Sequence, residues 1–439
     1  MKFLHYIWGL LVLLCFLNSC NTDANKVICN ENTHVKQGKS PKRGVSFAFS
    51  FSEDVSVLGP SISWYYNWSP AHAAKYDELN KEMNLDFCPM AWNGIDKSAL
   101  KKYKERHPEC KYLLTFNEPN LTDQANMTPQ QAAQKWPEIK AVAKEFGLKL
   151  ISPAMNYGTL ENYGDPIVWL DEFFELVPLS DVDGISLHCY MASPGALKWY
   201  ISRFKKYNKP IWLTEFCAWD GLNNETYTAE EQQQFMSDAI NYLESDSLIY
   251  RYAWFIPRGA ESENDFPYNF LLKNSSSFAL TDLGEIFTQI SAQDKNTYYG
   301  ECQTIEAEDY SSICIAEGVG TNSWVNGPRV RVTNDATHKT LELYDFFKEH
   351  WVEYQINPEA SGNYTLEIRY ASENNTRLQF DVNGALSSKF LLSNTGSNNT
   401  WKTAKIPISL EKGKQTFRIT IEAGSLKMNW LKFYNNLNS

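Results

Sequence analysis

Eight short apolar segments, separated by polar and helical stretches, occupy the chain between Arg43 and Ile290. This alternation is typical of a parallel sheet, in which helices connect successive strands. Eight strands in about 250 residues match the size of a (β/α)8 barrel. The predicted strands are Arg43–Phe49, Ile62–Trp68, Asp86–Trp92, Tyr112–Asn117, Lys149–Met155, Gly184–Tyr190, Pro210–Phe216 and Ile249–Phe255.

Helix-capping residues support this assignment. The segment Thr128–Phe146 begins with Thr-Pro and is followed by Gly147, and Thr228–Leu243 begins with Thr and has two early glutamates. A doubly wound sheet is the alternative, but it usually has a Gly-rich phosphate turn after its first strand. The stretch GVSFAFSFSED has no such turn. We therefore predict an α/β domain over residues 41–290, folded as a TIM barrel.

The pattern changes after Ile290. Residues 291–300 form a polar linker, and residues 301–439 contain short strands that follow one another directly, with turn residues such as Val382-Asn383-Gly384 between them. We predict an all-β jelly-roll sandwich. Its predicted strands are Trp351–Ile356, Gly362–Tyr370, Leu378–Val382, Lys402–Ile408, Gln415–Glu422 and Lys427–Tyr434.

The N-terminus reads as a targeting signal. Met1-Lys2 precedes an apolar run, Phe3–Leu17, that is shorter than the roughly 20 residues of a membrane-spanning helix. Leu17-Asn18-Ser19-Cys20 resembles a bacterial lipobox, which predicts a lipoprotein signal at 1–20, lipidation of Cys20 and a polar tether at 21–40. A plain signal peptide with a chance cysteine is the alternative. We expect a protein of the bacterial cell envelope, periplasmic or on the cell surface, held to the membrane by its lipid only.

Net charge and composition limit the kinds of partner that this chain can bind. The chain has 41 Lys and Arg against 52 Asp and Glu, a net charge of -11, whereas a nucleic-acid binder needs a positive footprint. Aromatic residues make up 14% of the chain, which suits a neutral ligand with apolar faces, such as a sugar. We expect a monomer that binds no nucleic acid.

Cysteines and histidines give little sign of metal or redox chemistry. Of the nine cysteines, the seven that follow Cys20 show no CxxC spacing and imply no disulfide framework, although Cys302 and Cys314 could pair. The seven histidines contain no HExxH motif or other close pair. A Ser-His-Asp hydrolase would need a G-x-S-x-G elbow, which does not occur. We expect no cofactor for catalysis.

Two glutamates end predicted strands. Glu118 follows the fourth strand in a polar Asn-Glu-Pro-Asn turn, and Glu215 lies near the end of the seventh among aromatic residues. In a barrel the active residues gather at the carboxyl ends of the strands. Cleavage of an acetal needs one carboxyl group to protonate the leaving oxygen and a second to face the anomeric carbon. A surface charge or a buried salt bridge is the alternative for either glutamate alone.

The motifs around these glutamates resemble glycoside hydrolase family 128 of clan A, over Arg43 to Phe287. The matching motifs are Arg43-Gly44, Ser63–Trp68, Pro89–Trp92, Phe116–Pro119, His188–Tyr190, Leu213–Phe216 and Ala279–Gly284. The resemblance implies an endo-β-1,3-glucanase that retains the anomeric configuration. It implies that Glu118 is the acid/base and Glu215 the nucleophile.

The same resemblance implies a set of substrate-binding residues. Asn117 would bind the sugar 2-hydroxyl, and Tyr190 or His188 would orient Glu215 or contact substrate. Four tryptophans would form stacking platforms for sugar rings: Trp64, Trp68, Trp92 and Trp254. Core packing is the alternative for each aromatic, and a buried core position is the alternative for His188.

The C-terminal domain resembles carbohydrate-binding module family 6 over Thr304 to Tyr434, through Thr304–Tyr310, Trp351–Tyr354, Gly362–Ala371 and Met428–Phe433. The resemblance implies a structural calcium held by Glu306 and Glu308, with an ordinary acidic edge as the alternative. It implies sugar binding through Tyr344 and Trp401. Lys427 replaces the expected asparagine, so binding at another face or a purely structural role stays open.

We therefore predict a retaining hydrolase of laminarin-type β-1,3-glucan that uses two glutamates. A non-catalytic surface glycan-binding lipoprotein is one alternative, and a clan A hydrolase of another β-glycan is the other. Retention of both Glu118 and Glu215 favours the enzyme over the binding protein.

Overall fold

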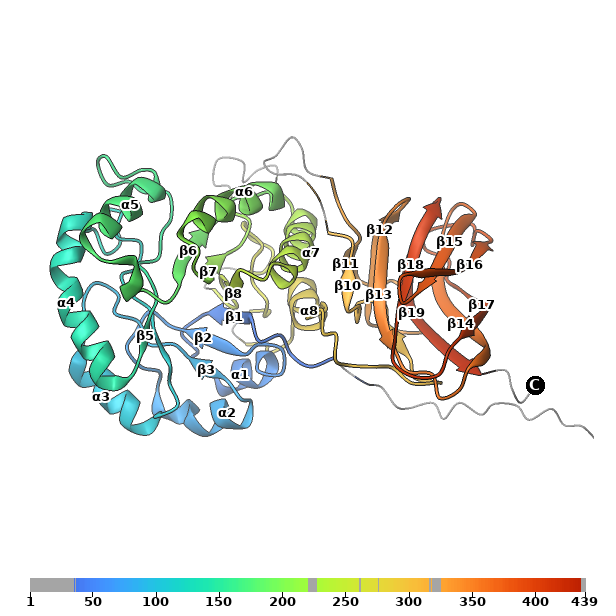
Figure 1. The fold of residues 1–439 in the computed structure, drawn as a ribbon, viewed down its shortest axis with the longest axis horizontal. Coiled ribbons are helices and arrows are strands. Elements are labelled where there is room, and N and C mark those ends of the chain that lie inside the picture. Colours follow the sequence, from blue (N-terminus) through green and yellow to red (C-terminus); the bar gives the residue numbers. More distant parts are fainter. Residues whose placement is uncertain are drawn as a thin grey trace, which may run out of the picture.

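The computed structural model describes residues 35, 37–219, 227–259, 262–274, 276–315, 317 and 325–435. Two domains lie side by side, an N-terminal α/β domain and a C-terminal all-β domain (Figure 1). The predicted signal, Cys20 and most of the tether lie outside the described residues. Within the described residues, no helix combines the length and the apolar character needed to cross a membrane.

Strands β1 to β8 of the α/β domain pair in parallel. Six of them form one sheet in the order β3-β2-β1-β8-β7-β6, and β4 pairs with β5. Isolated parallel bridges join Met90 to Leu114 and Ile151 to Gly184, next to the ends of these two sheets. The strands are β1 (Arg43–Ser46), β2 (Trp64–Tyr66), β3 (Asp86–Phe87), β4 (Tyr112–Leu113), β5 (Lys149–Leu150), β6 (Ile185–Cys189), β7 (Ile211–Phe216) and β8 (Ile249–Trp254).

Each parallel strand lies within its predicted range and is shorter than that range. At the carboxyl ends the ladder gives way to isolated bridges, as between Asn117 and Ala154. The residues beyond the ladder are therefore free to turn their side chains into a site.

Helices lie outside the parallel strands (Figure 1). They are α1 (Ser52–Leu58), η1 (Ala74–Tyr76), α2 (Asp77–Glu82), α3 (Lys97–Arg106), α4 (Pro129–Phe146), α5 (Pro166–Leu176), η2 (Leu179–Asp181), α6 (Pro194–Phe204), η3 (Lys205–Tyr207), α7 (Ala229–Ser245) and α8 (Asp282–Gln289). The two predicted helices are confirmed. Thr128 and Thr228 each form a capping box, and Gly147 ends α4 in the left-handed conformation that glycine adopts without strain.

The C-terminal domain consists of two antiparallel sheets, in the orders β10-β13-β18-β15-β16 and β11-β12-β19-β14-β17, with β9 beside β19. Buried residues alternate along β14 and β18, so each sheet has one buried face. The strands are β9 (Ile305–Glu306), β10 (Ser312–Ile313), β11 (Arg329–Val332), β12 (Leu341–Phe347), β13 (Trp351–Ile356), β14 (Gly362–Ala371), β15 (Thr376–Val382), β16 (Ala385–Leu392), β17 (Lys402–Leu410), β18 (Gln415–Ala423) and β19 (Ser425–Asn435).

The predicted strands of this domain are confirmed, but β9, β10, β11, β12 and β16 were not predicted. β12 is buried at most positions and β16 is exposed at most positions, so neither shows a clean alternation of polar and apolar residues. The turn at Asn383-Gly384, where both residues have positive φ, joins β15 to β16 as expected for this dipeptide.

Cys302 and Cys314, which the sequence left as a possible pair, are not bonded to each other. Cys302 is disulfide-bonded, whereas Cys314 has a free thiol. A pairing cannot be read from spacing, because it depends on the approach of two backbone segments.

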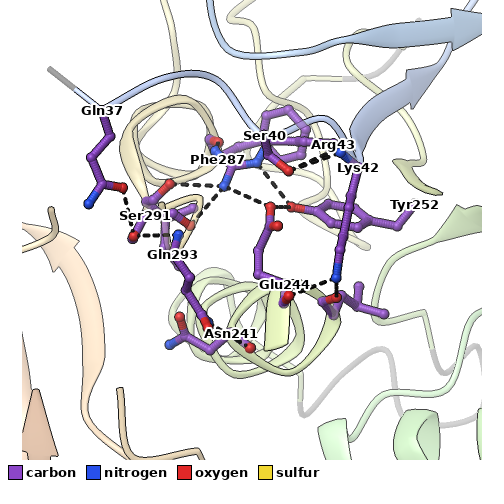
Figure 2. Close-up of polar contacts among 12 residues, drawn as sticks. Gln37, Ser40, Lys42, Arg43, Asn241, Glu244, Tyr252, Phe287, Ser291 and Gln293 are labelled. Carbon is purple, nitrogen blue, oxygen red and sulfur yellow. Dashed lines mark hydrogen bonds and ion pairs between the residues drawn. The ribbon is translucent and has the colours of Figure 1, made fainter. Parts of the chain in front are cut away.

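Lys42 and Arg43 at the start of β1 connect this strand to the ends of α7 and α8 (Figure 2). Lys42 Nζ donates to the carbonyls that end α7, including Glu244 O at 2.7 Å. Arg43 donates to Phe287 O at 2.8 Å and Ile290 O at 2.9 Å, at the end of α8. Cations here satisfy carbonyl groups that have no partner within their own helix.

One face of α7 contacts the C-terminal domain. Asp238 accepts both Arg329 Nη2, at 2.7 Å, and Arg329 Nε, at 3.1 Å. Ser237 Oγ accepts the backbone N–H of Val330 at 3.0 Å, and Asn241 accepts the Tyr310 hydroxyl at 2.6 Å. This face of α7 therefore supplies several of the polar contacts between the two domains, beside α8, which also contacts β11 and β12.

Candidate active site

Glu118 and Glu215 lie together at the carboxyl ends of the parallel strands. One carboxylate oxygen of Glu118, one of Glu215 and one ring nitrogen of His188 lie within 4.8 Å of one another. Both glutamates are buried, at 7% and 4% exposure. The two residues that the sequence singled out are thus neighbours, although 97 positions separate them in the chain.

His188 bridges the two carboxylates from β6. Its Nδ1 lies 2.9 Å from Glu118 Oε1, and its Nε2 lies 3.4 Å from Glu215 Oε1. Its exposure is 0%, so it positions the glutamates and offers no surface to a sugar. Burial acts to lower the pKa of His188, but the negative charges of Glu215 and Glu118 outweigh it and raise the pKa.

Glu118 is held as an anion. Burial acts to raise its pKa, but the hydrogen bond and charge of His188 and a 3.0 Å hydrogen bond from Asn156 Nδ2 lower it. Its φ of 44° lies in the left-handed region, where a residue with a Cβ is strained by about 1–3 kcal/mol. Such strain is characteristic of residues whose position matters for function.

Glu215 accepts hydrogen bonds from three aromatic side chains. Tyr66 Oη donates to Oε1 at 2.6 Å, Trp68 Nε1 donates to Oε1 at 2.7 Å, and Tyr190 Oη donates to Oε2. Three donors around one carboxylate fix both of its oxygens. Tyr190 and Trp68 therefore contact Glu215 itself, and Trp68, like Glu118, has a positive φ.

The prediction that Trp64 and Trp254 form stacking platforms for substrate is wrong. Both have 0% exposure, so neither has a ring face free for a sugar. Trp64 packs against Tyr66 and Trp212 in an interior cluster, and Trp254 packs against Phe216. Trp68 and Trp92 remain partly exposed, as a platform requires.

Asn117 lies beside Glu118. It is buried, its Nδ2 donates to Gln124 at 3.2 Å, and its Oδ1 has no hydrogen-bond partner among the described residues.

The sequence reasoning missed Tyr66 and Asn156 as site residues. Tyr66 occurs two positions before Trp68, and alternation along the strand places these two side chains on the same side. Asn156 follows the bridge residue Met155 beyond β5, at the edge where the other strands present their site residues. Its position after a predicted strand was the available signal.

A cleft of about 900 Å³ adjoins the glutamates. Asn156 and Tyr190 line it next to the site, Tyr157 and Trp219 line it with exposed aromatic rings, and Arg329 of the C-terminal domain lines it as well. The two domains thus both contribute to its wall.

In the C-terminal domain, the prediction that Tyr344 binds sugar is also wrong. It is buried at 5% exposure, under the guanidinium of Arg331 at 4.3 Å. Trp401 is partly exposed, and its Nε1 donates to Asn334 at 2.8 Å.

The predicted calcium ligands of this domain lie close together. Glu308 is buried, and burial and the charges of Glu306 and Asp309 raise its pKa well above the ordinary value. Its Oε2 has no hydrogen-bond partner among the described residues, whereas Glu306 is paired with His338 at 2.8 Å.

Comparison with known proteins assigns both domains of the chain to families. Residues 44–287 match the model of the glycosyl hydrolase catalytic core, and residues 329–433 match the model of carbohydrate-binding module family 35. The chain therefore belongs to the glycosyl hydrolase catalytic-core family and has a carbohydrate-binding module after its catalytic domain. The sequence motifs of the module resembled carbohydrate-binding module family 6, but the family model that matches it is family 35.

Two solved structures extend the comparison. A family 128 (subgroup II) endo-β-1,3-glucanase from Pseudomonas viridiflava is 38% identical, with a TM-score of 0.52, over 57% of this chain and 98% of that one. Another, from Sorangium cellulosum, is 33% identical, with a TM-score of 0.50, over 56% of this chain and 97% of that one. The resemblance to glycoside hydrolase family 128 is confirmed.

A curated relative is the alkali-sensitive linkage protein 1 of Schizosaccharomyces pombe, 26% identical over 261 residues. The match covers 56% of this chain and 44% of that protein, so this chain spans less than half of that relative's length.

Proposed function

We propose that this chain is a retaining glycoside hydrolase that cleaves β-1,3-glucan with Glu118 and Glu215. The observation that carries the proposal is the approach of the two carboxylates to within 4.8 Å. Retaining enzymes hold their carboxyl groups about 5–5.5 Å apart, whereas inverting enzymes need about 6.5–9.5 Å to admit a water molecule. We infer β-1,3-glucan as the substrate because the two similar solved structures are named endo-β-1,3-glucanases.

The strand order supports closure of the parallel strands into a (β/α)8 barrel. The isolated parallel bridges beside β4 and β5 lie where the two sheets would join. In such a barrel the catalytic groups at the carboxyl ends of different strands face one opening.

The reaction proceeds in two displacements. Glu215 attacks the anomeric carbon, the bond to the leaving oxygen breaks, and Glu118 gives that oxygen a proton. Glu118 then takes a proton from water, and the water oxygen displaces Glu215 from the sugar. Each displacement inverts the anomeric carbon, so the product retains its configuration.

His188 accounts for the proton that Glu118 needs. In the free site the proton of the pair resides on His188, since the pKa of His188 is raised and that of Glu118 is lowered. Substrate expels water from the site, which disfavours the charged pair and favours transfer of the proton from Nδ1 to Glu118 across 2.9 Å. Glu215, held by three donors, remains the attacking group.

The neighbouring cleft would hold the rest of the glucan chain. Tyr157 and Trp219 offer exposed ring faces of the kind on which sugar rings stack. Trp68 donates to Glu215, and the carbonyl of the partly exposed Trp92 accepts the backbone N–H of Asn117 at 2.8 Å. Asn117 would bind the 2-hydroxyl of the sugar under attack.

Product analysis with matched variants tests this function. The full chain is incubated with laminarin, xylan, mannan and cellulose, beside Glu118→Gln and Glu215→Gln. We expect cleavage of laminarin alone, first release of the β-anomer by NMR, and loss of activity by several orders of magnitude in both variants. Tight binding without cleavage would indicate a glycan-binding protein, and first release of the α-anomer would exclude the retaining mechanism.

We also propose a structural calcium at Glu306 and Glu308. The unpartnered Oε2 of buried Glu308 supports it, because a cation would satisfy that oxygen and offset the clustered negative charge. A chelator should lower the melting temperature of the module in the intact chain, and Glu308→Gln should remove that response. An unchanged melting temperature with chelator would contradict the proposal.

The lipobox supports a lipid anchor at Cys20, and with it a place in the bacterial envelope. Cys20→Ala should move the protein from the membrane fraction to the soluble fraction. An equal distribution of both proteins would contradict the anchor.

A further inference from the structure

A cluster of two histidines and one aspartate lies on the α/β domain and shares no residue with the catalytic site. His72 precedes η1, Asp77 begins α2, and His107 follows α3. One ligand atom from each lies within 4.8 Å of those from the other two. The spacing of the histidines in the sequence gave no sign of this arrangement, because the fold brings His107 to the other two residues.

The distances suit a metal ion. His107 Nε2 lies 3.1 Å from Asp77 Oδ1, and His72 Nδ1 lies 3.7 Å from the same oxygen. Zinc bonds of about 2.0–2.2 Å in tetrahedral geometry place neighbouring ligand atoms about 3.3 Å apart. Asp77 Oδ1 thus lies close to this spacing from a nitrogen of each histidine.

Outer contacts hold both rings in place. Glu109 Oε1 lies 3.1 Å from His107 Nδ1, which leaves Nε2 directed at Asp77. A carboxylate behind a histidine is the usual support of a metal ligand, because it fixes the ring and increases its basicity. Tyr103 stacks on His107 at 4.5 Å, and Asn80 lies 3.2 Å from His72 Nε2.

Competing contacts surround the cluster. Arg106 Nε lies 3.6 Å from Asp77 Oδ2, whereas the histidine contacts given above are to Oδ1. His72 Nδ1 also lies 3.0 Å from Ala73 O. For His72 Nδ1 to bind a metal, the proton must move to Nε2, and the amide of Asn80 must turn to accept it. Asn80 Oδ1 has no partner among the described residues, whereas Asn80 Nδ2 donates to Tyr65 Oη at 2.9 Å. The turn therefore replaces this bond by one in which the Tyr65 hydroxyl donates to Asn80 Oδ1.

Solvent reaches the cluster through a cavity of about 510 Å³, which His72, Asp77 and His107 line. Water can therefore complete the coordination of an ion held by three protein ligands. Two imidazole nitrogens and one carboxylate oxygen suit Zn²⁺ and the similar divalent ions Co²⁺ and Ni²⁺ better than Ca²⁺ or Mg²⁺.

We propose that His72, Asp77 and His107 bind one divalent transition-metal ion, with zinc as the best fit to the donors. The ion would link the segment before α2 to the segment after α3. This site is independent of the proposed function, because none of its residues belongs to the catalytic machinery.

Cobalt titration of the metal-stripped full chain tests the proposal, since Co²⁺ bound to nitrogen ligands gives visible absorption bands. We expect one high-affinity ion per chain, competed by Zn²⁺, and loss of the bands in His107→Ala. Glu109→Gln changes an exposed side chain and should weaken cobalt binding roughly 10–100-fold without affecting the fold. His350→Ala in the C-terminal domain is the matched control and should bind as the wild type does.

Two further variants exclude the other candidate positions. Glu215→Gln alters the catalytic trio and Glu308→Gln alters the calcium candidate, and both should retain the cobalt bands. The proposal is overturned if the bands survive His107→Ala with the circular dichroism of the fold unchanged. It is equally overturned if the bands disappear in Glu215→Gln, or if the wild type binds no cobalt.

Discussion

His188 contacts both Glu118 and Glu215, the two glutamates of the proposed mechanism. Its raised pKa stabilises the fold fully below the ordinary value of 6.5, and this contribution is lost as pH rises through the raised value. The lowered pKa of Glu118 stabilises the fold above 4.5, and this contribution is lost as pH falls through the lowered value. The ion pair therefore contributes its full stability between these two ordinary pKa values.

The same coupling predicts a pH profile. In the wild type we expect kcat/KM to fall on the alkaline side as His188 loses its proton, above pH 6.5. In His188→Gln only Glu118 can hold the proton, so the alkaline limb should move to lower pH and activity at neutral pH should fall at least about tenfold. Rates measured across pH on laminarin check this, and an unmoved alkaline limb would contradict the role of His188.

Tyr66 predicts a second effect at residue scale. Tyr66→Phe removes one of the three donors to Glu215, and a hydrogen bond to a charged group contributes about 1.5–3 kcal/mol. We expect kcat to fall by about 10–150-fold with little change in KM. Tyr76→Phe is the control, because its buried hydroxyl donates to Phe49 O instead, and its kcat should be that of the wild type. Equal rates in the two variants would show that Tyr66 does not assist Glu215.

At the scale of elements, Arg43 joins β1, α7, β8 and α8. Its guanidinium contacts Glu244 of α7 at 3.4 Å and the Tyr252 hydroxyl of β8 at 3.0 Å, besides the carbonyls that end α8 (Figure 2). All these groups are buried, so none can exchange its partner for water. The helices are thereby held to the sheet that carries Glu215.

Arg43→Met should destabilise the chain by about 3–5 kcal/mol, because it leaves the buried Glu244 without its cation. Lys97→Met breaks a surface pair with Glu145, in which both side chains are about half exposed, and should cost less than about 1 kcal/mol. Denaturant unfolding followed by circular dichroism measures both. Similar midpoints for the two variants would contradict the structural role of Arg43.

At the scale of the whole molecule, α7 is a helix of the α/β domain that also packs against the C-terminal domain. Its residues Ser237, Asp238 and Asn241 are buried against the C-terminal domain, and the cleft that adjoins the catalytic site includes Arg329. Ser291, in the predicted linker, is buried and accepts a hydrogen bond from Gln293 N. A polar linker is therefore part of a packed junction.

Arg329→Met should loosen this junction, since it leaves the buried Asp238 without its bidentate partner, at about 3–5 kcal/mol. We expect separate melting transitions for the two domains in calorimetry, and a larger radius of gyration in X-ray scattering. Arg418→Met, which breaks a partly exposed pair inside the module, is the control and should leave both unchanged. An unaltered variant would show that Arg329 does not hold the domains together.

The sequence predicted those features that depend on neighbouring residues. Strand periodicity, the capping threonines and the hairpin glycine act through bonds within a few positions, so Thr128, Thr228 and Gly384 could be recognised directly. Glu118 and Glu215 could be recognised as well, because parallel strands all present their carboxyl ends at one edge.

Only the tertiary structure decided which aromatic rings face the ligand and which side chains meet. Trp64 lies four residues before Trp68 on the same strand segment, yet it is sealed in the core while Trp68 holds Glu215. Trp64 and Trp68 differ in burial because they lie at different depths along the strand and because different distant segments pack on them. The bridge at His188 and the cluster of His72, Asp77 and His107 likewise depend on the register of strands and helices far apart in the chain, and no local pattern of residues encodes that register.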